Sequence, residues 1–130
     1  MTFAYFQAMS YFANGAFKAN INLQFLVVSE DRQWALENIL LPTSFHAPPH
    51  RINITHVTRN DAARDLAVMA ACDHVIMSTG TFGWWAGWLA NGTTVYYSDW
   101  PRNGSVLDKK FTREDFFPPT WIGMNGAGFE

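Results

Sequence analysis

The stretch HVIMSTGTFGWWAGWLANGTTVYYSDW, residues 74–100, decides the fold class. Its first five residues form a short apolar run that is typical of a buried strand. After a tight turn, FGWWAGWLA at 82–90 is apolar on most faces, which predicts a buried helix. TTVYYS at 93–98 returns to strand composition. A strand, a helix and a second strand in close succession predict two parallel strands joined by a crossover.

The same alternation extends toward the N-terminus. LQFLVVS at 23–29 and RINITHV at 51–57 indicate two further strands. Helical spacing of apolar residues is found at 3–13, at 34–40 and again at 61–73. Eight elements therefore alternate between helix and strand. This order predicts an α/β fold, a Rossmann-like parallel sheet with flanking helices.

Residues with capping side chains precede two of these helices. The polar residues at the end of the first strand, Ser29 and Asp31, could cap the helix that follows. Thr58 and Asn60 stand in the same relation to the helix at 61–73.

Composition and charge indicate one folded domain. The chain has 130 residues, with 48% apolar and 15% charged side chains, which fits a packed core. Its net charge is −2 and no Lys/Arg cluster occurs, so nucleic acid is not an expected partner. We expect residues 1–130 to be a single domain. After residue 100 the pattern fades into a tail that we expect to pack on the sheet or its edge, with residues 125–130 frayed.

Three features relate to cellular location. Cys72 is the one cysteine, which excludes an internal disulfide, and its apolar surroundings predict a buried thiol. N-x-[ST] sequons at Asn53, Asn91 and Asn103 favour a secretory lumen only mildly. The first seventeen residues lack a basic n-region and resemble neither a signal peptide nor a membrane span. For a lumenal protein, the targeting segment would therefore lie outside this sequence.

Metal binding is not expected. His46 and His50 lie in the proline-punctuated loop PTSFHAPPH at 42–50. No carboxylate or thiol stands nearby at ligand spacing, so this loop does not predict a metal site.

The turn between the strand at 74–78 and the next helix is a possible phosphate site. It reads Ser78-Thr79-Gly80-Thr81. Ligands bind beyond the carboxyl ends of parallel strands, and the N-terminus of a helix offers unpaired N–H groups to an anion. Many such turns bind nothing, however. The chain also lacks G-x-G-x-x-G and a P-loop lysine, which removes the main support for dinucleotide or P-loop binding.

Asp65 has two possible roles. A carboxylate on the helix before this turn could accept hydrogen bonds from N1–H and the exocyclic amine of guanine. The alternative is an ion pair on the helix surface with Arg59 or Arg64. The residue pattern alone favours the ion pair.

Longer motifs resemble the α-1,2-fucosyltransferases of glycosyltransferase family 11. The motifs are FLVVSEDRQWALENI, RDLAVMAACDHVIMSTGTFGWWAGWLANGTTVYYSDW and FFPPTWIGM, and the resemblance covers residues 5–124. It implies a two-domain GT-B-like architecture, of which this chain resembles the C-terminal domain that holds most contacts to the GDP-fucose donor.

The resemblance also implies site residues. Asp65 is the guanine-reading carboxylate. The diphosphate is cradled by the turn and helix start, Ser78, Thr79, Gly80, Thr81, Phe82 and Gly83. Trp84 and Trp85 pack beneath the sugar or fill the core. Ser29 and Asp31 stand where the family carries a Ser-Asn-Gly-like turn, and because Glu30-Asp31 departs from it we favour capping over ligand contact.

The implied reaction is metal-independent, inverting transfer of L-fucose from GDP-fucose to the 2-hydroxyl of a galactose on a glycan. The expected location is the Golgi, as a type II membrane protein whose signal anchor this sequence lacks. No general base is identified. Asp99, Glu114 and Asp115 are possible by position only, and each fits a surface carboxylate better.

One family feature has no counterpart in this sequence. The family carries an H-x-R-R-G-D-Y-like motif whose first arginine is thought to neutralise the departing GDP, in a segment before those matched here. We therefore expect a fragment without its acceptor-binding N-terminal domain, or a natural short relative, that binds donor but is catalytically incomplete. The alternatives are a non-catalytic GDP-sugar or fold-only relative and, more distantly, another Rossmann-like nucleotide binder.

Overall fold

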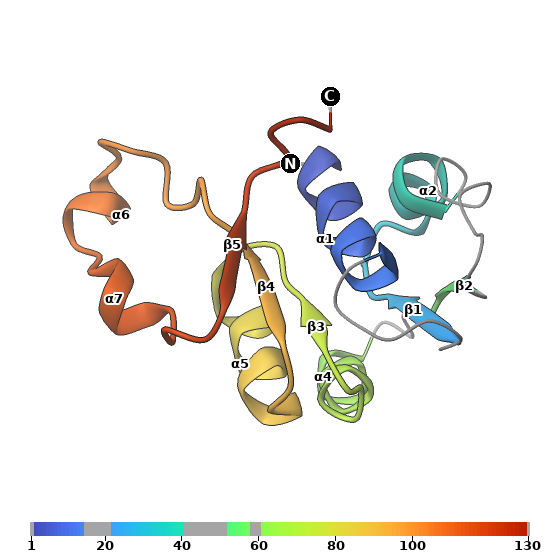
Figure 1. Ribbon diagram of the computed structural model, residues 1–130. Coiled ribbons are helices and arrows are strands. Elements are labelled where there is room, and N and C mark those ends of the chain that lie inside the picture. Colours follow the sequence, from blue (N-terminus) through green and yellow to red (C-terminus); the bar gives the residue numbers. More distant parts are fainter. Residues whose placement is uncertain (1, 15–21, 41–51, 58–60, 130) are drawn as a thin grey trace.

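The computed structural model describes residues 2–14, 22–40, 52–57 and 61–129, and for residues 52–54 the backbone only. Helices and strands alternate along most of this length (Figure 1). The elements in chain order are α1 (Thr2–Asn14), β1 (Leu23–Val27), α2 (Arg32–Ala35), the π-helical turn η1 (Leu36–Leu40), β2 (Ile52–His56), α4 (Ala62–Ala70), β3 (Val75–Ile76), α5 (Gly80–Ala90), β4 (Thr94–Tyr97), α6 (Val106–Lys109), α7 (Arg113–Phe116) and β5 (Ile122–Met124).

All the strand pairs in this part of the chain are parallel. β1 pairs with β2, Leu23 lying opposite Ile52. β3 pairs with β4 and β4 with β5, Val95 lying opposite both Ile76 and Ile122. This confirms the predicted α/β class with parallel strands and flanking helices. The strands form two sheets, of two and three strands, because no ladder joins β1 to β3 within the described residues.

Helices cover both faces of the strands. Figure 1 shows α1 on one side and α4 and α5 on the other. Successive residues of a strand point to opposite faces, so Ile76 packs against the α1 side while Val75 and Met77 belong to the core under α4 and α5. On the α1 side, Phe12 meets apolar residues of both sheets. Helix α1 therefore bridges the two sheets.

The buried face of α1 matches the sequence pattern only in part. Apolar residues at three-residue steps are Phe3, Phe6, Met9 and Phe12, of which Met9 and Phe12 are buried and Phe3 is exposed. The buried face also includes Ala4 and Ala8. Small alanine side chains let the helix backbone approach the sheet closely, and this close packing outweighs the burial of one more phenyl ring.

The helix after β3 packs tightly because it carries glycines where it meets the sheet. A Cβ added at Gly83 would lie 2.8 Å from Met77 Cβ, and one at Gly87 would lie 2.7 Å from Thr94 Oγ1. Asn91 ends the helix in the left-handed conformation, with φ 58°, which asparagine adopts more readily than most residues.

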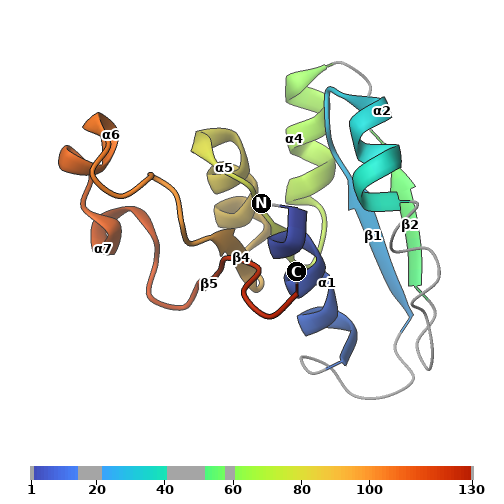
Figure 2. The same cartoon turned by 90° about the horizontal axis from the view of Figure 1, so that it is seen from above.

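The tail after residue 100 contains a strand that the sequence did not reveal. β5 lies along the free edge of β4, in agreement with the expected packing at the sheet edge. In the sequence, α6 and α7 lie between β4 and β5. In space they lie on the opposite side of β5 from β1 and β2 (Figure 2). Arg113 anchors this excursion by donating to the carbonyl oxygens of Ser98, Trp100 and Pro101 at 3.1, 3.0 and 2.8 Å.

The end of the chain docks on its beginning. Gly126 is buried, and its N–H donates to Gln7 Oε1 of α1 at 2.8 Å. Phe129 N–H donates to Gly126 O at 3.0 Å. Both donors belong to the segment 125–130, which the sequence predicted to be frayed.

Two local predictions need correction. The N-cap of α4 is Asp61, whose side chain accepts from Arg64 N–H at 3.2 Å, while Thr58 and Asn60 lie outside the described residues. Cys72 is half-buried rather than buried, because α4 ends at Ala70 and the thiol lies in the turn beyond it. Its Sγ donates to Val68 O at 3.4 Å.

Candidate functional site

A cavity of about 860 Å³ opens where β1 and β3 end. It is lined by the carboxyl end of β1 and the turn after it, by Ser78 and Thr79 after β3, by the first turn of α5, and by one face of α4. Ligand sites of parallel α/β proteins lie beyond the carboxyl ends of the strands, at a switch in strand order. Here the break between the two sheets provides that position.

The first turn of α5 faces this cavity with its N–H groups uncapped by a side chain. Thr79 is the N-cap residue, but its side chain makes no capping hydrogen bond. In α2 and α4, by contrast, Asp31 and Asp61 fill that role. Unpaired N–H groups and the positive end of the helix dipole favour an anion at such a position. The N–H groups at the start of α5 can therefore donate to a phosphate oxygen.

Most of the predicted phosphate residues meet in this cavity. Ser78, Thr79, Phe82 and Gly83 belong to its lining, whereas Gly80 and Thr81 do not. Gly80 has φ +84°, a conformation that side chains disfavour, so it serves the turn. Gly83 also has a packing role, since it lets α5 lie against Met77.

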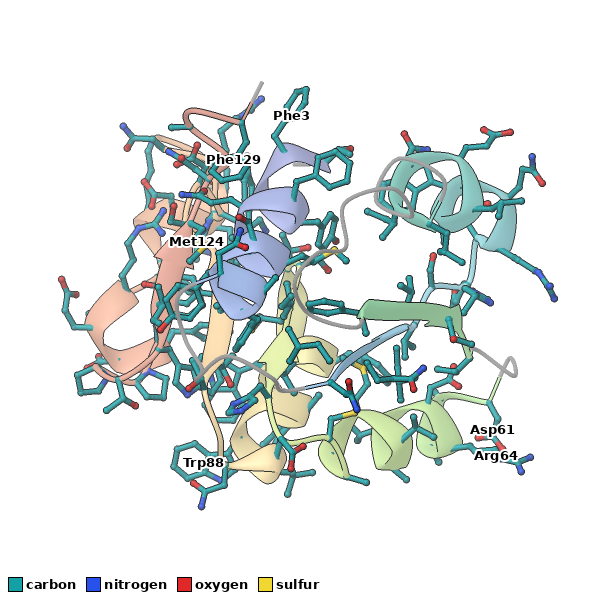
Figure 3. The ribbon with its side chains drawn as sticks, turned by 45° about the vertical axis from the view of Figure 1, so that its right-hand side comes forward. Phe3, Asp61, Arg64, Trp88, Met124 and Phe129 are labelled. Carbon is teal, nitrogen blue, oxygen red and sulfur yellow. The ribbon has the colours of Figure 1, made fainter. Side chains whose placement is uncertain are left out.

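Asp65 lies in the same cavity, one turn into α4. It is 6% exposed and its N–H donates to Asp61 O at 2.9 Å. The cavity thus joins the predicted base-reading carboxylate to the predicted phosphate turn. The ion-pair alternative stays open, because Arg59 lies outside the described residues. Asp61 and Arg64 both stand at the start of α4 (Figure 3).

Asp31 caps α2, as the sequence predicted, whereas Ser29 bonds to the backbone of Asp31 and not to the helix. Asp31 Oδ1 accepts from Trp34 N–H at 2.9 Å. Ser29 Oγ lies 3.2 Å from both the N–H and the carbonyl oxygen of Asp31, which tightens the turn after β1. His56 Nε2 contacts Ser29 O at 2.9 Å and fixes the same turn from β2. Ser29 and Asp31 also line the cavity.

Sequence reasoning missed two aromatic residues of the cavity. Tyr5 reaches it from α1 and Trp34 from α2, and their rings meet edge to face at a centroid distance of 6.2 Å. Burial raises the pKa of the Tyr5 phenol and hydrogen bonding by Ser78 lowers it in part, so the hydroxyl stays protonated at neutral pH.

The other predicted residues lie elsewhere. Trp84 fills the core, where its Nε1–H donates to Phe116 O at 2.6 Å. Trp85 is 50% exposed, and Trp88 projects from α5 away from the strands (Figure 3). Three exposed carboxylates stand outside the cavity lining: Asp99, Glu114 and Asp115.

The charge of the cavity is negative. Its described lining includes Glu30, Asp31, Asp61 and Asp65, and no Lys, Arg or His. Within the same residue ranges, no group of three or more His, Cys, Asp or Glu side chains is arranged to hold a metal ion. His46 and His50 lie outside them. In the described lining, the groups that can donate to an anion are therefore backbone N–H groups and hydroxyls.

Comparison with known proteins identifies the family. The family described as Glycosyl transferase family 11 matches residues 5–125. A Caenorhabditis elegans protein named galactoside 2-alpha-L-fucosyltransferase is 35% identical over 108 residues, which are 78% of this chain and 30% of that protein. The mouse and human proteins named galactoside alpha-(1,2)-fucosyltransferase 1 are 39% and 36% identical, over 78% of this chain and 26% of each relative.

The chain thus spans between a quarter and a third of the length of these relatives. No solved structure matches it. Across the described ranges, no helix is both long and apolar enough to span a bilayer.

Proposed function

Because the chain belongs to glycosyl transferase family 11, we propose that its cavity binds the GDP-fucose donor of an α-1,2-fucosyltransferase. One observation carries this proposal: buried Asp65 and the uncapped start of α5 line a single cavity at the strand ends. A nucleotide needs these two features together, one for the base and one for the phosphates. The relatives' names supply the reaction class.

In the proposed complex, each end of the nucleotide meets matching chemistry. The carboxylate of Asp65 accepts from N1–H and the exocyclic amine of guanine, a donor pair that adenine lacks on that edge. The diphosphate lies against Ser78 and Thr79, whose hydroxyls and the N–H groups of α5 donate to its oxygens. These assignments make the cavity selective for the guanine base.

The proposed reaction moves L-fucose to the 2-hydroxyl of a terminal galactose with inversion, and no metal enters it. As the bond to fucose breaks, negative charge grows on the β-phosphate. The start of α5 stabilises part of that charge, and a further cationic donor of the kind the described lining lacks is worth about 3 kcal/mol in comparable sites. We therefore propose that this chain binds donor without completing transfer by itself.

Location and acceptor follow from the same proposal. The names of the relatives point to a galactose-terminated glycan as acceptor. A Golgi lumenal setting agrees with the sequons at Asn91 and Asn103, which are both exposed.

Titration calorimetry of the 130-residue chain with GDP, ADP and UDP tests donor binding. We expect GDP to bind most tightly. Asp65→Asn keeps the size of the side chain but turns one acceptor oxygen into a donor. It should therefore lower the affinity for GDP by about tenfold or more and leave the affinity for UDP unchanged. Asp99→Asn is the matched control, since Asp99 is exposed and outside the cavity lining.

Equal affinities for the three nucleotides would refute the base assignment. In the same preparation we expect no fucosylation of a β-galactoside. Measurable transfer would show that the chain is catalytically complete, and GDP binding without transfer is the proposed outcome.

A further inference from the structure

We propose, as an inference that rests on the proposed function, that β1 and β3 pair when GDP binds, so that the two sheets close into one. β1 lies on the side of β3 that faces away from β4 (Figure 1). Pairing would give the strand order β2-β1-β3-β4-β5. This order is common in parallel α/β proteins, and it places the ligand site between β1 and β3.

Two cavities show that β1 and β3 run side by side in the same direction. The proposed donor cavity is lined by residues at the carboxyl ends of both strands. A second cavity, of about 700 Å³, is lined by residues at their amino ends, among them Leu23 and Val75. Leu26 and Ile76 line both cavities. The cavities therefore meet at the level of Leu26 and Ile76, and the gap between the sheets runs along both strands.

The existing ladders determine which backbone groups face this gap. Val27 O accepts a backbone hydrogen bond from the β2 side at 3.1 Å, and Met77 N–H donates one to β4 at 2.9 Å. Along a parallel strand, the N–H and C=O of one residue point to the same side, and those of the next residue point to the other. The backbone groups of Leu26 and Ile76 therefore point into the gap, each toward the opposite strand.

Side chains already connect the two sheets on both faces. On one face, Phe25 of β1 and Ile76 of β3 pack in the same cluster as Phe12 of α1. On the other face, Met69 of α4 lines both cavities. Closing the gap would keep these contacts and add backbone hydrogen bonds between β1 and β3. The strands can therefore approach without uncovering either face.

Donor binding favours the closed form because the cavity has walls on both sides of the gap. Ser29 and Asp31 belong to the turn after β1, whereas Ser78 and Thr79 follow β3. A nucleotide that contacts both walls binds more tightly when they are close together. A ligand shifts a conformational equilibrium only through such a difference in affinity.

Binding without closure makes a different prediction. Any ligand of the folded chain slows hydrogen exchange at all amides that exchange through global unfolding, and it slows them equally. Closure adds protection only at the alternate residues that face the gap. Neighbouring amides of one strand therefore distinguish the two cases.

The experiment is amide hydrogen exchange, measured by NMR on the ¹⁵N-labelled 130-residue chain with and without saturating GDP. Leu26 and Ile76 are the reporters. Val27 and Met77 are the matched controls, because each is the next residue of the same strand and its backbone faces a ladder that already exists. Calorimetry on the same preparation establishes that GDP is bound.

We expect GDP to slow exchange at Leu26 and Ile76 by about tenfold or more beyond any slowing at Val27 and Met77, because the new backbone bonds must open before these amides exchange. In the free chain, Leu26 and Ile76 should exchange faster than their two neighbours.

Three outcomes would overturn the inference while GDP binding, and with it the proposed function, stands. Exchange at Leu26 and Ile76 is unchanged by bound GDP, or it is slowed no more than at Val27 and Met77, or it is already as slow as at these neighbours in the free chain. A chain that does not bind GDP would refute the proposed function and this inference together.

Discussion

Cys72 shows how local surroundings set the reactivity of a single side chain. Burial raises the pKa of its thiol, and the neighbouring carboxylate of Asp73 raises that pKa further by repelling the thiolate. The hydrogen bond from Sγ to Val68 O also favours the protonated form. Since the thiolate is the nucleophile, this cysteine should be slow to react although it is partly accessible.

The prediction is that iodoacetamide alkylates Cys72 several-fold more slowly in the folded chain than in urea at pH 8. The folded-state rate should reach half its maximum above the ordinary thiol pKa of 9.0. Because the folded pKa is raised, the unfolded chain loses its proton first, and stability falls as pH rises above about 9. Mass spectrometry of the alkylated product measures the rates.

Asp73→Asn serves as the matched variant. It should move the rate profile toward lower pH by removing the smaller of the two causes. A folded chain that reacts as fast as the unfolded one would contradict the prediction.

Individual residues also show what the sequence could reveal. Asp65 and the turn at Ser78 could be predicted as site residues because local motifs carry them. Tyr5 was missed, because it reaches the cavity from α1, and apolar spacing along this helix contains no information about which side chain enters a cavity at the strand ends. Capping by Asp31 was predictable since the bond spans three residues.

At the scale of elements, the contact between α5 and β4 depends on a missing side chain. Thr94 is buried opposite Gly87, and Trp121 closes the same space. Two heavy atoms of Thr94 lie within 2.8 Å of where a Cβ at Gly87 would stand, and Trp121 Cη2 lies at 3.2 Å. The helix can approach the strand this closely only with glycine at that position.

Gly87→Ala should therefore destabilise the chain, although alanine favours a helix by about 1 kcal/mol. Forcing a methyl group into a filled core costs about 1–3 kcal/mol, and Thr94 is held in a strand that cannot retreat. We expect a net loss of about 1 kcal/mol in the free energy of unfolding, measured with urea.

The double variant Gly87→Ala/Thr94→Ala tests the cause. Thr94→Ala removes both close atoms, so the two losses should be less than additive. Simple additivity would show that the cost of Gly87→Ala arises elsewhere.

Elements with strong local patterns were predicted best. β3, α5 and β4 follow one another with short turns, and each has its own apolar signal. β5 was not predicted, because it has only three residues and lies on a sheet edge, where burial does not impose an apolar pattern. Its strand geometry comes from β4, its partner in space.

At the scale of the whole molecule, charge and topology combine at one place. The chain carries a net charge of −2, and its cavity gathers four carboxylates between the ends of two sheets. The sequence predicted the parallel strands but not the break between β1 and β3, since strand order is not written in local patterns. The carboxylates in the cavity walls repel an anion that enters, while the N-terminus of α5 attracts it.

Glu30 offers a test of this repulsion, on the premise that GDP binds here. Its side chain is exposed at the cavity wall, so Glu30→Gln should raise the affinity for GDP by about two- to threefold at low salt. The effect should shrink at higher salt, because salt screens the charge. Glu37→Gln is the control, because Glu37 is equally exposed but stands outside the lining. Calorimetry at two salt concentrations measures both. Equal effects of the two variants would exclude a local electrostatic cause.

The contact between Gln7 and Gly126 spans 119 residues. During synthesis α1 leaves the ribosome before the residues that cover Phe12, which include Val95 of β4 and Ile122 and Met124 of β5. The apolar face of α1 therefore stays uncovered until β5 has been synthesised. We expect α1 to dock on the sheets only after that point, so α1 is a segment that a chaperone would have to shield in the meantime.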